Sequence, residues 1–274
     1  MPEPAGPVLE VTGLRKEYGD LVAVDDVSFS VPEGGSLAIV GESGSGKTTV
    51  ARMIVGLERP TAGRIIACGA DRSRPARSAA DRRRRGREVQ IVFQDPYTSL
   101  DPRQTAEQAL GEVIRLHHRW PAQRCRERVA ELTGLVGLDE RQARAVPRAL
   151  SGGQRQRVAI ARALAAEPRL LILDESVAAL DVSIQAQVLN LLADIRDATG
   201  VSYILISHDL AVVRQLTDEA IVMRRGQVVE RGATARVLDH PEHPYTQRLR
   251  ASVPRPGWKP VRRGLAGGEE AISA

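Results

Sequence analysis

The chain is poor in aromatic side chains and in cysteine. Aromatic residues make up 3% of its 274 residues, whereas 42% are hydrophobic. A buried core must therefore be built from Leu, Val, Ile and Ala, as in many layered α/β folds. The two cysteines, Cys68 and Cys125, stand far apart and lack C-x-x-C spacing. This favours free thiols over a disulfide or a metal site.

Long apolar runs are also missing. No stretch approaches the roughly 18 apolar residues that a membrane span needs. The first residues, Met1-Pro2-Glu3-Pro4, lack the basic and then apolar pattern of a secretion signal. We therefore expect this chain to stay in the cytoplasm.

Positive charge is present but unevenly distributed. The formal net charge is +5, and much of the excess lies between Arg72 and Arg87, which includes four consecutive arginines at 82–85. A nucleic-acid surface is one interpretation, but the run has no interleaved aromatic residues for base stacking. We interpret it as a solvated loop and expect no nucleic-acid partner.

A glycine-rich segment, GESGSGKT at 41–48, directly follows the apolar run at 37–40 and fits the pattern G-x-x-x-x-G-K-[ST]. Its glycines let backbone N–H groups converge on an oxyanion, and a helix that opens after Gly46 directs its positive dipole end to the same point. Lys47 would reach β- and γ-phosphates, and the Thr48 hydroxyl would be one Mg²⁺ ligand. The residues of this candidate phosphate site are Gly41, Glu42, Ser43, Gly44, Ser45, Gly46, Lys47, Thr48 and Thr49.

Strands and helices alternate along most of the chain. Short strands at 8–11 and 23–29 predict an antiparallel β entry, and apolar runs at 89–93, 170–173 and 202–207 predict buried parallel strands. Between them, helical periodicity without strands predicts a helical subdomain inserted over about 95–155. Gln227–Glu230 and the preceding run at 220–223 predict a terminal hairpin. The expected fold is α/β, with a mostly parallel sheet of the P-loop NTPase type.

Two acidic residues, Asp174 and Glu175, end the apolar run at 170–173. At the carboxyl edge of a parallel sheet, Asp174 would lie beside the phosphate loop and hold Mg²⁺ through water. Glu175 would lean over the γ-phosphate, where its carboxylate could polarise an attacking water.

The motif Leu150-Ser151-Gly152-Gly153-Gln154, upstream of the acidic pair, resembles the signature of the ATP-binding cassette (ABC) proteins. The resemblance covers the chain from Val8 to about Leu249 and implies ATP and Mg²⁺ as ligands. It implies that Tyr18 stacks on adenine, that Gln94 links the γ-phosphate and Mg²⁺ to the helical subdomain, and that His208 contacts the γ-phosphate. The implied catalytic residues are Glu175, His208, Gln94 and Lys47, and the implied Mg²⁺ ligands are Thr48, Gln94 and Asp174.

The signature also predicts a dimer. A second helix begins at Ser151, and its first N–H groups, those of Gly152 and Gly153, form a second anion site. The phosphates in this chain are already bound by its own glycine-rich loop, so the second site is free to bind the nucleotide of another subunit. The family's head-to-tail dimer implies that this signature, with Gln154, completes the nucleotide site of another subunit. The chain departs from the family at Ala178, where serine is usual, and at 146–149, where Pro-His-Glu is frequent.

Within the family, residues 93–103 (FQDPYTSLDPR) and 243–247 (HPYTQ) resemble the oligopeptide, dipeptide and nickel importers. This implies an ATPase subunit on the cytoplasmic face of the membrane, with two transmembrane permease subunits and a second ABC ATPase subunit, identical or related. An extracytoplasmic solute-binding protein would act indirectly. The implied ATP-binding domain spans 8–240, and a branch-specific extension, partly disordered, spans 241–274.

Other interpretations remain at this stage. A soluble cassette that acts on DNA or ribosomes would usually carry a coiled-coil insertion or a second phosphate loop, and neither is found here. A kinase-like transferase would share the loop but has no use for the signature. The transported solute, peptide or nickel or another, is left open. Asp239, His240, Glu242 and His243 could form a metal cluster, but two prolines interrupt their helical spacing.

Overall fold

The computed structural model describes residues 6–94, 99–176 and 181–251. Its main sheet has six strands in the order β10-β9-β3-β8-β7-β6. Neighbouring strands are parallel, except β9 and β10, which form the predicted hairpin. The strands are β3 (Ser36–Val40), β6 (Val89–Val92), β7 (Leu170–Asp174), β8 (Ser202–Ser207), β9 (Glu219–Arg224) and β10 (Gln227–Ala233).

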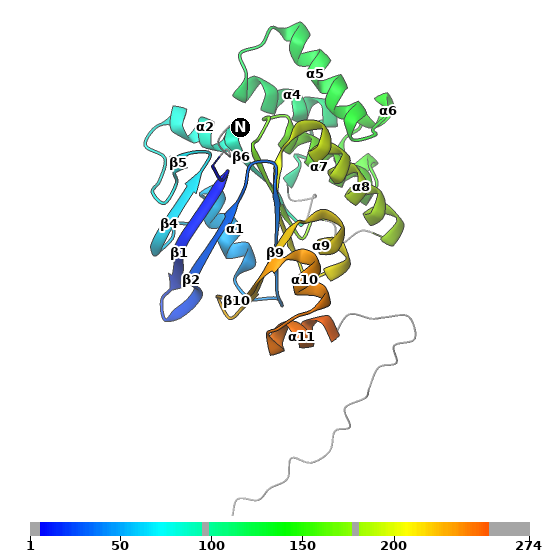
Figure 1. The fold of residues 1–274 in the computed structure, drawn as a ribbon. Coiled ribbons are helices and arrows are strands. Elements are labelled where there is room, and N and C mark those ends of the chain that lie inside the picture. Colours follow the sequence, from blue (N-terminus) through cyan, green and yellow to red (C-terminus); the bar gives the residue numbers. More distant parts are fainter. Residues whose placement is uncertain (1–5, 95–98, 177–180, 252–274) are drawn as a thin grey trace, which may run out of the picture.

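A second, antiparallel sheet of four strands lies beside the main one (Figure 1). It has the order β2-β1-β4-β5 and is formed by β1 (Leu9–Tyr18), β2 (Leu21–Val31), β4 (Ala62–Ala67) and β5 (Ala70–Asp71). The antiparallel entry is confirmed, but its first two strands extend to a Tyr18–Leu21 pair, well beyond the predicted ends. Register shifts along β1 interrupt the regular alternation of apolar residues, so the sequence did not indicate this extension.

The buried strands have apolar side chains on both faces. In β3, Leu37 and Ile39 pack toward α1 (Lys47–Val55) and the antiparallel sheet, whereas Ala38 and Val40 belong to the core on the other face. That second core also contains side chains of α7 (Gly152–Leu164), α8 (Val182–Thr199), α9 (Leu210–Leu216) and α10 (Thr234–Asp239). A strand covered on both faces needs a continuous apolar run, which explains why these strands were recognisable in the sequence.

The predicted helical stretch contains α4 (Ala106–His117), α5 (Ala122–Leu135), α6 (Glu140–Ala143) and a 3₁₀ turn (Pro147–Ala149). These helices lie at the top of the molecule in Figure 1. Helix α4 begins at a capping box of Thr105 and Gln108, in which each side chain accepts the other residue's backbone N–H. Among the described residues, none of the helices combines the length and the apolar character needed to cross a bilayer.

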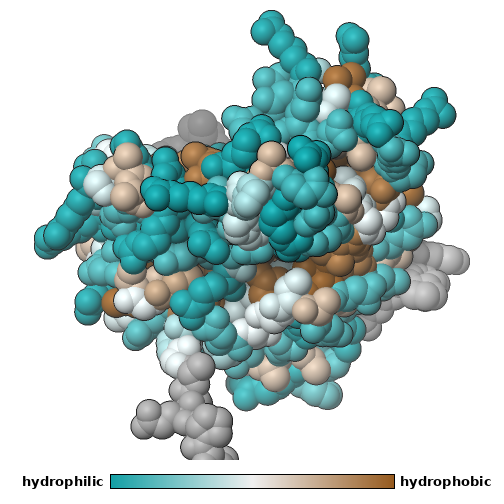
Figure 2. All heavy atoms as spheres, turned by 90° about the horizontal axis from the view of Figure 1, so that it is seen from above, coloured by the Kyte–Doolittle hydropathy of each residue, from teal (hydrophilic) through white to brown (hydrophobic). Residues whose placement is uncertain are grey.

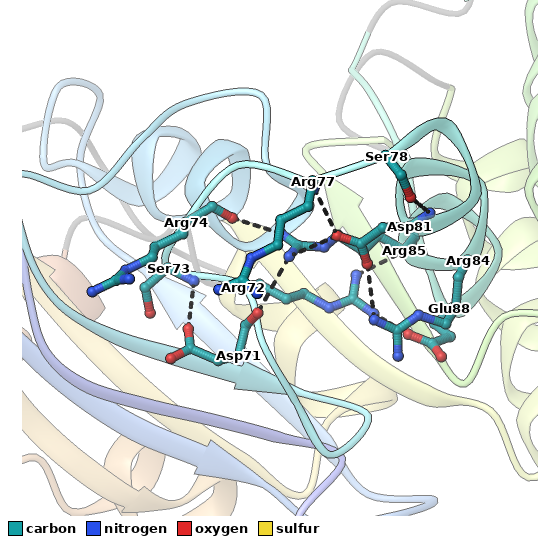
Figure 3. Close-up of polar contacts among 10 residues, drawn as sticks. All are labelled: Asp71, Arg72, Ser73, Arg74, Arg77, Ser78, Asp81, Arg84, Arg85 and Glu88. Carbon is teal, nitrogen blue, oxygen red and sulfur yellow. Dashed lines mark hydrogen bonds and ion pairs between the residues drawn. The ribbon is translucent and has the colours of Figure 1, made fainter.

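The arginine-rich segment was predicted as a loop, and that prediction is wrong: residues Ala79–Glu88 form helix α2. The Ser78 hydroxyl caps the helix by accepting the Asp81 N–H at 3.1 Å. Asp81 in turn binds Arg84 at 2.8 Å and Arg85 at 3.1 Å (Figure 3). The helix buries none of its residues. It therefore lacks the apolar periodicity from which helices are recognised, and its cap and ion pairs stabilise it instead.

Arg72, just before this helix, is 4% exposed. Its Nη2 lies 2.5 Å from Glu88 Oε2, and its Nη1 donates to the Arg85 carbonyl at 3.0 Å. Because Arg72→Ala would leave Glu88 without this partner in a largely enclosed position, we expect the free energy of unfolding to fall by about 3 kcal/mol. The exposed Arg82→Ala should change it by less than about 0.5 kcal/mol. Urea unfolding of both variants measures the difference, and equal stabilities would contradict a structural role for Arg72.

Candidate functional site

Three parallel strands bring the glycine-rich loop, Asp174, Glu175 and His208 to one edge of the main sheet. In the register of β3 and β8, Val40 pairs with Ser207, and in that of β7 and β8, Asp174 pairs with Ile206. The carboxyl ends of the strands therefore lie side by side. The glycine-rich loop follows β3, Glu175 follows β7, and His208 follows β8. This is where ligands bind in open α/β sheets.

Two positions of the glycine-rich loop, Gly41 and Gly46, leave no room for a side chain. A Cβ atom at Gly41 would lie 2.3 Å from the Met223 carbonyl oxygen. Gly46 has φ +102°, and a Cβ there would lie 2.5 Å from the Ala23 carbonyl oxygen. The Gly226 N–H, from the β9–β10 turn, donates to the Ser45 carbonyl at 3.1 Å. Strands from both sheets thus fix the shape of the loop.

Lys47, the first residue of α1, carries its ammonium group into the loop. The side chain is buried, and Nζ donates to the carbonyls of Gly41 at 2.7 Å and Glu42 at 2.8 Å. Burial lowers the Lys47 pKa, and the carboxylates of Glu175, Asp174 and Glu42 oppose that shift. The first N–H groups of α1 lack intrahelical acceptors. The loop therefore concentrates positive potential at one point, as an anion site requires.

Thr48 and Asp174 form a pair of oxygen ligands beside this point. The Thr48 hydroxyl donates to Asp174 Oδ1 at 3.2 Å, and Asp174 is 5% exposed. Burial raises the Asp174 pKa, although the Thr48 hydrogen bond lowers it, so a cation next to the carboxylate would offset its desolvation. Among the described residues, no cluster of three or more His, Cys, Asp or Glu could hold a metal. A magnesium ion held by few protein oxygens together with substrate phosphates fits this pair.

Glu175 and His208 face each other at the same edge, with 3.4 Å between His208 Nδ1 and Glu175 Oε1. Glu175 has φ +47°, in the left-handed region that is costly for a non-glycine residue. Its N–H donates to the Ile206 carbonyl at 2.9 Å, which holds the peptide in place.

A cavity of about 360 Å³ lies over the loop. Its lining includes the predicted residues Ser43, Gly44, Gly46, Lys47, Thr48, Thr49 and Glu175. It also includes residues that the sequence did not indicate: Leu21, Val22 and Ala23 of β2, and Arg225 and Gly226 of the β9–β10 turn. These residues belong to no sequence motif. The tertiary fold brings them to the loop, so the sequence alone could not indicate them.

Comparison with known proteins identifies the family. Residues 24–178, more than half of the chain, match the family described as ABC transporter. The chain belongs to this family.

Individual ABC proteins resemble the chain along most of its length. The oligopeptide transport ATP-binding protein OppD of Mycobacterium bovis is 45% identical over 251 residues, which are 92% of this chain but 40% of OppD. The oligopeptide transport ATP-binding protein AppF of Bacillus subtilis is 45% identical over 88% of this chain and 73% of AppF. The chain thus spans less than half the length of OppD. The predicted resemblance to the oligopeptide branch is confirmed.

A solved ABC structure confirms the predicted fold class. The ATP-binding cassette MJ0796, in a dimeric post-hydrolysis state bound to ADP and Pi, superposes with a TM-score of 0.74 at 28% identity. The match covers 82% of this chain and 98% of MJ0796.

The ABC signature residues lie at the start of α7. Ser151 and Gln154 form a capping box: the Gln154 N–H donates to Ser151 Oγ at 3.3 Å, and the Ser151 N–H donates to Gln154 Oε1 at 2.8 Å. Gly153 packs against Ile184, since a Cβ there would lie 2.4 Å from its Cγ2. Within the described part of the chain, the residues that line the loop cavity include none of the signature.

Further predicted site residues also lie outside the cavity lining: Tyr18, Gly41, Glu42, Ser45, Gln94, Asp174 and His208. Tyr18, at the end of β1, is 44% exposed, and Lys16 Nζ lies 4.6 Å from its ring centroid. Gln94 is exposed just beyond β6. The resemblance also matches Ala178-Ala179-Leu180-Asp181 to a loop that crosses the dimer interface, and the first three of these residues lie outside the described part of the chain. The roles of these residues remain predictions.

Proposed function

We propose that this chain is the ATP-hydrolysing nucleotide-binding subunit of a membrane ABC importer for di- or oligopeptides. The observation that carries the proposal is one sheet edge that joins a glycine-rich anion loop, a buried lysine, the Thr48–Asp174 oxygen pair and the Glu175–His208 pair. The names of the relatives, among them OppD and AppF, support peptides as the solute class.

In this proposal the predicted site residues bind different parts of Mg-ATP. Lys47 exchanges its carbonyl partners for oxygens of the β- and γ-phosphates, and the loop N–H groups bind the remaining oxygens. Tyr18 stacks on the adenine. Thr48, Gln94 and Asp174 would hold Mg²⁺. When bound, Mg²⁺ would neutralise charge on the phosphate oxygens.

Glu175 positions and polarises the attacking water, and His208 holds the Glu175 carboxylate and contacts the γ-phosphate. The water oxygen forms a bond to the γ-phosphorus while the bond from that phosphorus to the β–γ bridging oxygen breaks. The products are ADP and inorganic phosphate, and the Glu175 carboxylate accepts the proton that leaves the water.

The position of the signature, away from the cavity of its own loop, supports a site shared between two subunits. A helix start with an N-cap serine binds anions, yet it does not line the cavity of its own loop. We propose that Ser151, Gly152, Gly153 and Gln154 of one subunit complete the nucleotide site of the other. ATP would then hold the dimer together, and hydrolysis would release it.

Mixing two inactive variants tests the shared site. Lys47→Ala damages the loop, and Ser151→Arg damages the signature, so a mixed dimer has one site with both changes and one with neither. A random one-to-one mixture should recover about a quarter of wild-type phosphate release, since half of the dimers are mixed and each has one intact site of two. If purified mixed dimers with two affinity tags release no more phosphate than either parent, the shared site is contradicted. If the natural partner is a related cassette, one of the two variants must be made in that partner instead of in a second copy of this chain.

The proposed partners are two transmembrane permease subunits, with an extracytoplasmic solute-binding protein acting indirectly, which would place the chain on the cytoplasmic face of the membrane. A cavity of about 850 Å³ lies between α4, α5 and α6. A helix of a permease subunit could dock there. The view of the molecule from above shows hydrophobic side chains in hollows between hydrophilic projections (Figure 2). Co-purification from solubilised membranes tests this: the permease subunits should accompany the tagged chain. Recovery with ribosomes or DNA instead would contradict it.

A further inference from the structure

The last described helix, α11 (Pro244–Ala251), reaches back to the phosphate loop. Its residue Tyr245 is 3% exposed and belongs to the core on one face of the main sheet. The Tyr245 hydroxyl accepts the backbone N–H of Glu42 at 3.1 Å, although the two residues are 203 positions apart. A side chain from the segment 241–251 thus contacts the loop directly.

The Tyr245 side chain has a well-defined position. Just before α11, the N–H groups of Glu242 and His243 donate to the Glu230 carboxylate at 2.9 and 3.2 Å. Burial raises the pKa of Glu230, but the Thr246 side chain and these two N–H groups together outweigh it and leave the pKa below its usual value, so the carboxylate stays ionised at neutral pH. The Arg224 guanidinium lies 5.2 Å from the centroid of the Tyr245 ring.

Glu42 links this contact to the centre of the site. Its carbonyl accepts from Lys47 Nζ at 2.8 Å and from the Ser45 N–H at 3.2 Å. The residue therefore has the Tyr245 hydroxyl on its N–H and the loop lysine on its carbonyl. Movement of Glu42 would shift the turn at Ser45 and the resting position of Lys47 together.

We infer that Tyr245 is a positioning residue of the phosphate loop, and that it acts through Glu42. Tyr245 does not line the loop cavity in the described part of the chain, so it acts without touching the nucleotide. Without the hydroxyl, the Glu42 N–H loses its acceptor and the loop samples more conformations. A ligand must then order the loop as it binds, which weakens the binding. The consequence for ATP rests on the proposed function, whereas the constraint on the loop does not.

Tyr245→Phe in the full chain removes the hydroxyl and keeps the ring. Arg250→Ala is the matched control, because Arg250 Nη1 donates to the Asp239 carbonyl at 2.6 Å and so holds the same helix without contacting the loop. Amide hydrogen exchange at Glu42 and the calorimetric Kd for Mg-ATP are measured for both variants. Tyr245→Phe should speed exchange at Glu42 and raise the Kd about two- to tenfold, the equivalent of one lost hydrogen bond. Arg250→Ala should match the wild type in both.

Three results would overturn the inference: wild-type exchange at Glu42 in Tyr245→Phe, faster exchange there with an unchanged Kd, or the same changes in both variants. The last would mean that docking of α11, and not the hydroxyl, matters. If the wild type binds no ATP but Tyr245→Phe still speeds exchange at Glu42, the positioning contact stands and the proposed function fails. The two hypotheses are thus tested separately.

Discussion

Replacing Lys47 with alanine should abolish ATP binding, with a Kd for Mg-ATP at least roughly a hundredfold higher than that of the wild type. The ammonium group is buried in the loop and is the point charge available to the β- and γ-phosphates. Hydrogen bonds to charged groups contribute about 1.5–3 kcal/mol each, so losing two of them gives a change of this size. Calorimetric titration with Mg-ATP measures it, and phosphate release and transport should be lost with binding.

Arg59→Ala is the control for this prediction. Arg59 is exposed just after α1, so the variant removes the same charge without altering the loop. It should bind Mg-ATP as the wild type does. Both variants should unfold cooperatively, which shows that the fold is intact. Normal Mg-ATP binding by Lys47→Ala would show that the glycine-rich loop is not the nucleotide site.

Glu175→Gln should keep ATP binding and lower kcat by about 10²- to 10⁴-fold, the usual contribution of a general base. Glutamine has nearly the same shape but cannot accept a proton from the attacking water. Since binding and dimerisation would persist while turnover stops, an ATP-bound dimer should accumulate and survive gel filtration. Single-turnover phosphate release separates this loss of chemistry from a loss of affinity.

Glu219→Gln is the control, because it makes the same chemical change at the opposite edge of the sheet, where the parallel strands begin. In the register of β3 and β9, Glu219 pairs with Leu37, near the amino end of both strands and away from the loop. This variant should turn over ATP at the wild-type rate. Wild-type turnover in Glu175→Gln would remove Glu175 from its proposed role.

The parts of the fold that the sequence predicted correctly have local signals. The strands at 170–173 and 202–207 are continuous apolar runs because helices and a second sheet cover both faces. Helix α2 has no apolar face, so its arginines were interpreted as a loop. Its stability comes from a cap and from ion pairs centred on Asp81, whose pKa is lowered to about 2, chiefly by the hydrogen bond from Arg84.

The site residues likewise differ in how far the sequence alone could predict them. Lys47, Thr48, Asp174 and Glu175 could be placed from physics, because a loop and two acidic residues at the carboxyl edge of a parallel sheet must meet. Tyr18, Gln94 and the signature were assigned through the family resemblance alone, and the cavity lining does not include them. Contacts such as Tyr245 with Glu42 join residues 203 positions apart, and no pattern in a single sequence indicates such a pair.

The most direct test of the proposed function is phosphate release from Mg-ATP by the purified chain, measured at increasing protein concentration and with its natural partner if that is a related cassette. We predict release of inorganic phosphate at a rate that rises more steeply than protein concentration, because two subunits form each site, and that disappears in Lys47→Ala. No release above that of Lys47→Ala at any concentration, or transfer of the phosphate to an acceptor other than water, would contradict the account.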